Sequence, residues 1–195
     1  MTKLQTAITI SISASLCLGV VLIILFYERM KQSVIGTITG NYFTDTELCR
    51  SDTARKYGID NTPSAEQWTN LHALRDNILN PARETYGSCI YVNVAFRSAE
   101  LNKKLIELGY TASDNSQHCK GEAADITTKT LKGNRELFSI IAALGNFDQL
   151  IWEGNGTWIH VSYSSTGKQR GQILAQNTNK RGYTDITNNW QTAIA

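Results

Sequence analysis

The sequence contains no run of five or more basic residues, and its formal net charge is only +2 over 195 residues. Proteins whose main partner is nucleic acid usually carry a concentrated basic patch, so this charge pattern argues against that class. The chain is 42% hydrophobic and 18% charged, which is typical of a folded protein rather than a disordered one. These counts predict one ordinary domain with an additional segment, and no nucleic-acid partner.

Cysteine is scarce, and no two cysteines have the CxxC spacing. The four are Cys17, Cys49, Cys89 and Cys119, of which Cys17 falls in an apolar N-terminal stretch. The three that remain are an odd number, which argues against a disulfide framework. We expect small buried thiols. One disulfide with a thiol left over is the alternative.

Charged residues are absent from Ala7 to Tyr27. At ~1.5 Å per residue, this stretch is long enough to cross the roughly 30 Å hydrocarbon core of a bilayer. A cleaved signal peptide would end in small residues, whereas this stretch ends in Phe26 and Tyr27. Leu16, directly before Cys17, does not fit a lipoprotein cleavage box, which requires a small residue there. We therefore predict an uncleaved transmembrane helix.

This helix divides the chain. We predict a membrane anchor at 1–32, a linker at 33–40, a folded domain at 41–175 and a polar, disordered tail at 176–195. The orientation of the anchor is not fixed by charge, because Lys3 on one side nearly balances Arg29 and Lys31 on the other. The first half of the span, up to Gly19, is only weakly hydrophobic, which also permits a helix that can leave the membrane.

Helices and strands are predicted to interleave irregularly in the soluble part. Capping-box spacing at Thr44 and Ser64 predicts two helix starts, and Pro81 is expected to kink or end the second helix. Periodicity and capping signals predict further helices at 98–108 and 135–144, and strands at 91–96, 123–126, 147–152 and 158–163. Because there is neither a regular βαβ repeat nor an internal repeat, this order predicts an α+β domain.

Three side chains suited to zinc stand out. His118 and Asp125 flank Gly121, where the chain can turn, and Asp125 lies in a short apolar strand that would hold its carboxylate. Alternation in the strand around His160 places its side chain opposite the apolar face, so we expect it to face a polar cleft. Two histidines and one carboxylate leave a fourth coordination position for water, which is typical of a catalytic zinc site.

The segment around His118 also matches a known signature. Residues 116–125 read Ser-x-His-x-x-Gly-x-Ala-x-Asp. This pattern resembles the zinc D-alanyl-D-alanine carboxypeptidase family, which includes phage endolysins and shares its fold with the hedgehog signalling domain. Segments on both sides resemble the same family, particularly its phage-type branch: Phe43 with Glu47, then 51–55, 61–64, 81–83, Phe96-Arg97-Ser98 with Asn102, 147–151 and 158–162. The resemblance covers about residues 41–175.

The resemblance implies a small antiparallel sheet flanked by helices and a Zn²⁺ ion bound by His118, Asp125 and His160. It also implies that Arg97 holds and polarises the substrate. From the residues alone, Arg97 closes a strand where a guanidinium could bind a carboxylate or carbonyl. Ser116 is expected to position the loop around His118. The third histidine, His72, lies on a helix beside apolar neighbours and is interpreted as structural.

The general base is where this sequence departs from the family. The carboxypeptidases have an acidic residue three positions before the last zinc histidine, and Thr157 stands there. Glu153 follows a predicted strand much as a glutamate does in hedgehog domains, and we predict it as the base. Asp148 and Glu122 are the alternatives, with structural roles expected for both.

Together these features predict a zinc metallopeptidase that hydrolyses peptide bonds in peptidoglycan stem peptides, as a D,D-carboxypeptidase or an endopeptidase. Because its substrate lies outside the cytoplasmic membrane, we expect a single-pass membrane protein with the peptidase domain on the extracytoplasmic side. Two alternatives stay open. The missing acid at Thr157 is compatible with a zinc-bearing module that binds wall peptides without cutting them. The weakly hydrophobic span is compatible with a phage lytic enzyme released from the membrane.

Overall fold

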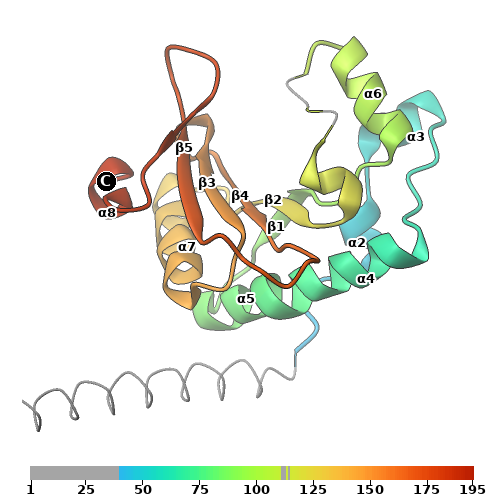
Figure 1. Cartoon of the computed structure of the whole chain (residues 1–195). Coiled ribbons are helices and arrows are strands. Elements are labelled where there is room, and N and C mark those ends of the chain that lie inside the picture. The colour runs from blue at the N-terminus through green and yellow to red at the C-terminus, as the bar shows by residue number, and fades with distance from the viewer. Residues whose placement is uncertain (1–39, 111–112, 114) are drawn as a thin grey trace, which may run out of the picture. The chain divides into compact units, whose positions relative to one another are not determined.

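A six-stranded sheet forms the centre of the protein in the computed structural model, which describes residues 40–110, 113 and 115–195. The strand order across the sheet is β1-β2-β4-β3-β5-β6 (Figure 1). The strands are β1 (Tyr91–Val94), β2 (Ala123–Thr127), β3 (Gln149–Glu153), β4 (Trp158–Ser162), β5 (Gln172–Gln176) and β6 (Tyr183–Asp185). All neighbours pair antiparallel except β3 and β5, which are parallel. The α+β prediction is confirmed, but the sheet is mixed rather than wholly antiparallel.

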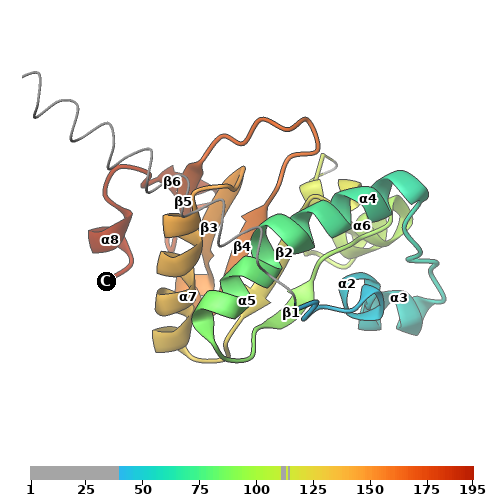
Figure 2. The ribbon, with the colours of Figure 1, turned by 90° about the horizontal axis from the view of Figure 1, so that it is seen from below.

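The larger helices are α4 (Ala65–Leu74), α5 (Asn80–Tyr86), α6 (Ala99–Glu107) and α7 (Leu131–Leu144), and the shorter ones are α2 (Asp45–Cys49), α3 (Asp52–Tyr57) and α8 (Trp190–Ala193). Of these, α4, α5 and α7 cover one face of the sheet (Figure 2). Alternation sends Ile126, Leu150, Ile159 and Val161 to this face, where they are fully buried with the apolar side chains of the helices. The opposite face is thereby left for the polar residues of β2 and β4.

The predicted helix starts are confirmed by their caps. The Thr44 side chain accepts a hydrogen bond from the Glu47 amide, and Ser64 and Gln67 form a complete capping box. Helix α7 begins four residues earlier than predicted, because Thr130 caps it through the amide of Gly133.

Pro81 was predicted to kink or end its helix, but the helix does not end there. Helix α4 continues through a π-helical segment, η1 (Arg75–Leu79), into α5, which carries Pro81 in its first turn. The widened turn provides an acceptor for the last amide before the proline, since Asn80 N–H donates to the carbonyl of Arg75. Pro81 itself has no N–H to donate, so the continuous helix lacks one backbone hydrogen bond at that position.

The C-terminal segment is the main correction to the sequence-based picture. Residues predicted as a disordered tail contain β6 and α8, and they pack on the domain. Ile186 and Ile194 are each only 5% exposed, and the Trp190 ring lies 5.9 Å from that of Phe138. The Arg135 guanidinium donates to the carbonyl of Ile194 at 2.8 Å. The few apolar residues of this polar stretch do not repeat with the period of a helix or a strand, so the sequence did not predict its structure. Their contacts with the core nevertheless order the segment.

The cysteines and the predicted membrane span were the remaining sequence-based expectations about the fold. The prediction of buried thiols is wrong for Cys89, which is exposed, whereas Cys49 and Cys119 are half-buried. Within the described residues, no helix is long and apolar enough to cross a bilayer. The span predicted from Ala7 to Tyr27 lies outside them.

Candidate metal centre

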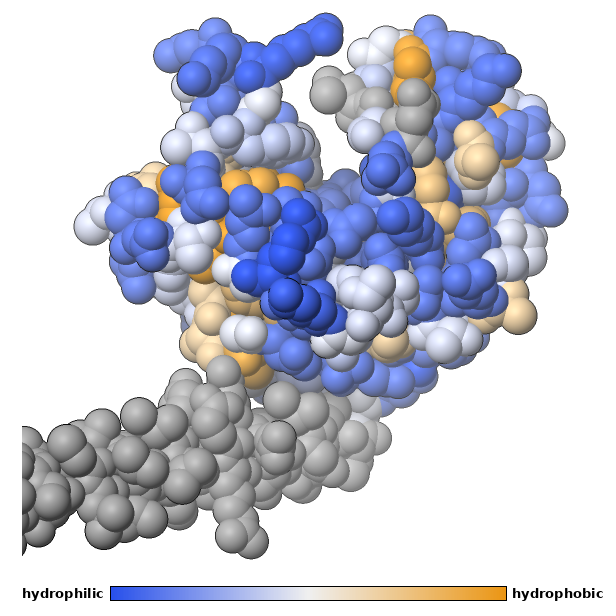
Figure 3. Space-filling view, in the orientation of Figure 1, coloured by the Kyte–Doolittle hydropathy of each residue, from blue (hydrophilic) through white to orange (hydrophobic). Residues whose placement is uncertain are grey.

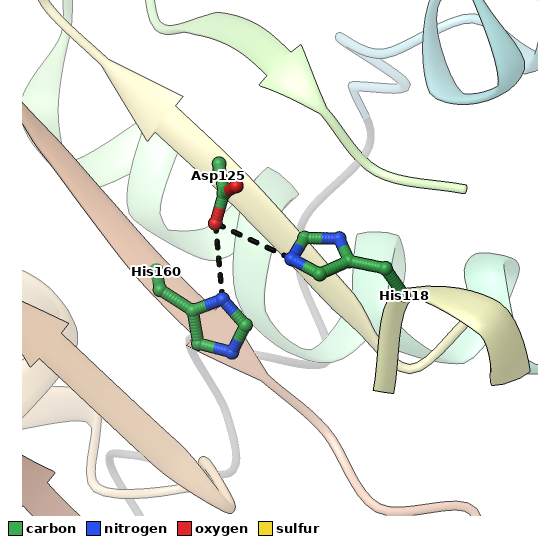
Figure 4. Close-up of side chains that lie close together, drawn as sticks. All are labelled: His118, Asp125 and His160. Carbon is green, nitrogen blue, oxygen red and sulfur yellow. Dashed lines mark hydrogen bonds and ion pairs between the residues drawn. The ribbon is translucent and has the colours of Figure 1, made fainter. Parts of the chain in front are cut away.

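His118, Asp125 and His160 meet on the face of the sheet opposite the hydrophobic core. Asp125 is the middle residue of β2 and pairs directly with His160, the middle residue of β4, so both side chains leave the sheet on the same side. His118 lies on a short 3₁₀ turn, η2 (Gln117–Lys120), which ends just before β2. Figure 4 shows the rings of both histidines turned toward the same oxygen of the Asp125 carboxylate.

The three side chains converge on one oxygen. Oδ1 of Asp125 lies 3.0 Å from Nδ1 of His160 and 3.4 Å from Nε2 of His118. One ligand atom from each residue lies within 4.8 Å of the other two. Two imidazole nitrogens and a carboxylate oxygen are the donor set of catalytic zinc sites. The residues present therefore fit a zinc ion.

The surroundings of His118 also fit a metal ligand. Its side chain is buried, and Nδ1 lies 2.8 Å from the carbonyl oxygen of Ala95. A carbonyl can only accept, so Nδ1 carries the proton and the lone pair of Nε2 is available to a metal ion. Burial lowers the pKa of His118, which favours the neutral imidazole that a metal requires. Although burial alone would raise the pKa of Asp125, His118 and His160 hold it well below its usual range.

Gly121 fixes the turn that carries His118. Its φ is +74°, and a Cβ there would lie 2.5 Å from the carbonyl oxygen of Gln67 in α4. The side-chain amide of Gln67 in turn donates to the carbonyl of Cys119 at 2.9 Å. Only glycine therefore allows the metal-site turn to pack directly on this helix.

We expect Gly121→Ala to lower the free energy of unfolding by about 2–4 kcal/mol, because backbone strain adds to a clash with a carbonyl group. Chemical denaturation would measure the loss. Gly58→Ala is the matched control, since Gly58 also has a positive φ (+64°) but open space around its Cβ; it should cost only about 1 kcal/mol. Equal losses in the two variants would show that the contact with Gln67 is unimportant.

Arg97 and Ser116 lie together at the edge of the site. The guanidinium Nη2 of Arg97 is 3.5 Å from Oγ of Ser116, and its Nε is buried without a hydrogen-bond partner among the described residues. The backbone amide of Arg97 donates to the carbonyl of His118. The positive charge of Arg97 contributes to the pKa shifts of both His118 and Glu153, which places it in the same electrostatic environment.

Glu153 is the last residue of β3 and projects to the same face as the histidines. Ile151 pairs with His160 and Glu153 with Trp158, so Glu153 is one step along the same face. Its side chain is buried, and Oε1 accepts a hydrogen bond from the Tyr183 hydroxyl at 3.2 Å. Burial raises the pKa of Glu153, and the negative charge of Asp125 raises it further. The structure thus places Glu153 on the face of the sheet that carries the candidate metal centre, where the charges of Asp125 and His160 act on it.

The alternative bases have structural partners. Asp148 binds Arg170 through two hydrogen bonds to its guanidinium and accepts a third from Gln117 at 2.9 Å, which hold its pKa below the usual range. Glu122 accepts a hydrogen bond from the amide of Ser165 at 2.8 Å. Both carboxylates thereby fasten the loop between β4 and β5 to the domain.

Two further residues occupy positions that fit structural roles. The carbonyl of Thr157 accepts a hydrogen bond from the buried amide of Asn134, which fixes the turn between β3 and β4. His72 lies on α4, 2.9 Å from Asp45 at the surface, and is not among the three residues of the metal centre.

Sequence reasoning missed Tyr183, which lies in the stretch predicted as a disordered tail. The short apolar run Ile173-Leu174-Ala175 between two glutamines could have indicated β5, and the Gly182-Tyr183 step could have indicated a returning strand. Without the parallel pairing of β5 to β3, however, nothing in the sequence connects Tyr183 with Glu153.

Comparison with known proteins gives one family. The sequence model of a family described as peptidase M15 matches residues 41–162, which include all three ligand candidates, Arg97 and Glu153. No curated protein matches the chain.

Proposed function

Because the chain belongs to the peptidase M15 family of zinc peptidases, we propose that it hydrolyses peptide bonds in peptidoglycan stem peptides, as a D,D-carboxypeptidase or an endopeptidase of the phage-type branch. The observation that carries the proposal is the convergence of His118, Asp125 and His160 on the polar face of the sheet, from which Glu153 also projects. This arrangement supports metal-assisted hydrolysis, because it combines a zinc donor set with a nearby carboxylate.

The zinc donor set would be His118, Asp125 and His160. When bound there, Zn²⁺ supplies a Lewis acid that lowers the pKa of water and polarises a carbonyl group. The protein contributes the rigid frame: two ligands lie in paired strands, and the third is oriented through the Ala95 carbonyl.

Glu153 would act as general base and then as general acid. It takes a proton from the attacking water as the new carbon–oxygen bond forms, and it delivers that proton to the leaving nitrogen as the carbon–nitrogen bond breaks. The raised pKa of Glu153 suits both its role as base and its role as acid. A carboxyl group whose pKa lies closer to the working pH can accept a proton in one step and release it in the next.

Arg97 would orient the peptide. The side chain of Arg97 is only half-buried, so N–H groups at the end of its guanidinium would donate to a carboxylate or carbonyl of the substrate. Ser116 holds the other side of the guanidinium and keeps it beside the metal-site turn. This arrangement suits a substrate whose scissile bond lies near a free carboxylate or a backbone carbonyl.

The test is mass spectrometry of muropeptides incubated with the full-length protein in detergent and zinc. Loss of a terminal D-alanine would identify a carboxypeptidase, and cleavage within the stem or cross-bridge would identify an endopeptidase. A zinc-loaded protein that binds muropeptides but leaves their masses unchanged would contradict the proposal and support the binding-module alternative.

We further propose that residues 7–27 anchor the protein in the cytoplasmic membrane with the peptidase domain outside. A reporter that is active only outside the cytoplasm, fused after Ala195, should be active, because peptidoglycan lies on that side. The same fusion without residues 7–27 is the control and should be inactive. Activity of a cytoplasm-only reporter in the full-length fusion would contradict this topology. Fractionation before and during lysis would distinguish a permanent anchor from a released lytic enzyme.

A further inference from the structure

The hairpin of β5 and β6 lies beside the candidate active site. It follows Ser162, the last residue matched by the family model. β5 pairs with β3, and β6 pairs with β5, so the hairpin extends the sheet beyond Glu153. Figure 3 shows that the end of the hairpin is hydrophilic and that the surface is hollowed beside it.

The register of this extension determines which side chains approach Glu153. Ala175 pairs with Trp152 in β3 and with Thr184 in β6. Their neighbours Glu153, Gln176 and Tyr183 therefore project from the opposite face, the one that carries the metal centre. The hydroxyl of Tyr183 reaches Oε1 of Glu153 at 3.2 Å.

Other contacts hold the hairpin in this position. Oε1 of Gln176 accepts a hydrogen bond from the amide of Gly154 at 2.8 Å, directly after Glu153. Across the hairpin, the Thr184 hydroxyl donates to Oδ1 of Asn177 at 2.7 Å. Ile186, which follows β6, is buried, and its amide donates to the carbonyl of Ile173. Hydrogen bonds at Gln176 and at Ile186 thus hold the segment that carries Tyr183.

We propose that Tyr183 is a positioning residue of this peptidase, whose hydroxyl holds Oε1 of Glu153 so that Oε2 receives the proton of the attacking water. The inference rests on the proposed function, in which Glu153 is the base. A buried carboxylate at the end of a strand has several rotamers, and a fixed donor on one oxygen selects one of them.

The ionisation of the two groups supports this assignment. Burial and the negative charges of Glu153 and Asp125 raise the pKa of Tyr183 to about 12. The hydroxyl therefore remains protonated near neutral pH and serves as a constant donor. Its hydrogen bond favours the ionised form of Glu153 and partly opposes the effect of burial, so the carboxylate stays available as a base.

The experiment compares Tyr183→Phe, which removes only the hydroxyl, with Thr184→Val on the same strand. Thr184→Val removes a hydrogen bond within the hairpin but does not touch Glu153. Tyr183→Phe should lower kcat by about 10–100-fold on a muropeptide substrate with KM and zinc content unchanged, as expected for a lost hydrogen bond to a charged group. Thr184→Val should stay within about twofold of wild type.

A double-mutant cycle separates positioning from a purely structural role. If Tyr183 acts through Glu153, then adding Tyr183→Phe to Glu153→Gln should cause little further loss of kcat. Equal losses in the wild-type and Glu153→Gln backgrounds would overturn the inference. So would wild-type kcat in Tyr183→Phe, or an equally large loss in Thr184→Val.

A second readout does not depend on activity. With 3-fluorotyrosine at position 183 of the zinc-free protein, Glu153→Gln should shift the fluorine NMR resonance, whereas Thr184→Val should leave it nearly unchanged. An unchanged resonance in Glu153→Gln would overturn the contact itself. Failure of the proposed function is recognised separately, since the wild-type protein would then cleave no muropeptide, or Glu153→Gln would cleave at the wild-type rate.

Discussion

The Glu153→Gln variant is expected to keep the fold and the zinc ion but to lose hydrolysis by about 10²–10⁴-fold, the usual contribution of general acid–base catalysis. Glutamine preserves the shape of the side chain and can still meet the Tyr183 hydroxyl, but it cannot accept and return a proton. The measurement is kcat on a defined muropeptide, together with zinc content and thermal unfolding to confirm that the site is intact.

Thr157→Ala is the matched control for this experiment. Thr157 stands where the sequence resemblance leads us to expect an acidic residue, but in the structure its backbone carbonyl accepts a hydrogen bond from the side-chain amide of Asn134. Removing its side chain should therefore cost far less activity than Glu153→Gln. Wild-type cleavage by Glu153→Gln would place the base elsewhere, and Asp148 would be tested next.

The second large effect is expected at the metal ligands. The wild-type protein should bind one zinc ion per chain, and His118→Ala or His160→Ala should lose most of it, because two ligands cannot hold zinc as three do. Asp125→Asn should also weaken binding, since a neutral amide is a poorer ligand than a carboxylate. Elemental analysis of the purified proteins measures the zinc content, and hydrolysis should fall with it.

His72→Ala is the control for these variants. It removes the third histidine of the chain, which lies on α4 beside Asp45 rather than in the metal centre. Its zinc content should equal that of wild type. If instead all three histidine variants retained equal zinc, the proposed ligand set would be wrong.

The sequence was most informative where a side chain's direction or a turn depends only on residues close to it in the chain. His160 lies in a strand with clear alternation, so the face from which its side chain projects could be predicted before its pairing with Asp125 was known. The turn at Gly121 likewise follows from a residue that tolerates positive φ. At these two positions, local rules are sufficient.

The parts that were not predicted depend on contacts between distant segments. The π-helical turn before Pro81 keeps the helix continuous, whereas the local pattern at a proline predicts a kink or an end. Tyr183 reaches Glu153 only because β5 joins β3 in parallel, and strand order is not contained in the periodicity of either strand. The tail was judged by its low apolar content, whereas its order depends on a few buried residues such as Ile186 and Ile194.

The parallel pairing of β5 with β3 also affects how the protein reaches its folded state. β3 and β4 can form a hairpin as soon as both have been synthesised, but until β5 arrives, β3 is an edge strand with unpaired backbone groups. The segment that closes this edge comes late in the chain, and Ile194, near the end of the sequence, contributes to the core. During synthesis the domain therefore passes through a stage with an open sheet edge beside the metal ligands. A chain that stops at the end of the family match would remain there, prone to pairing with other copies.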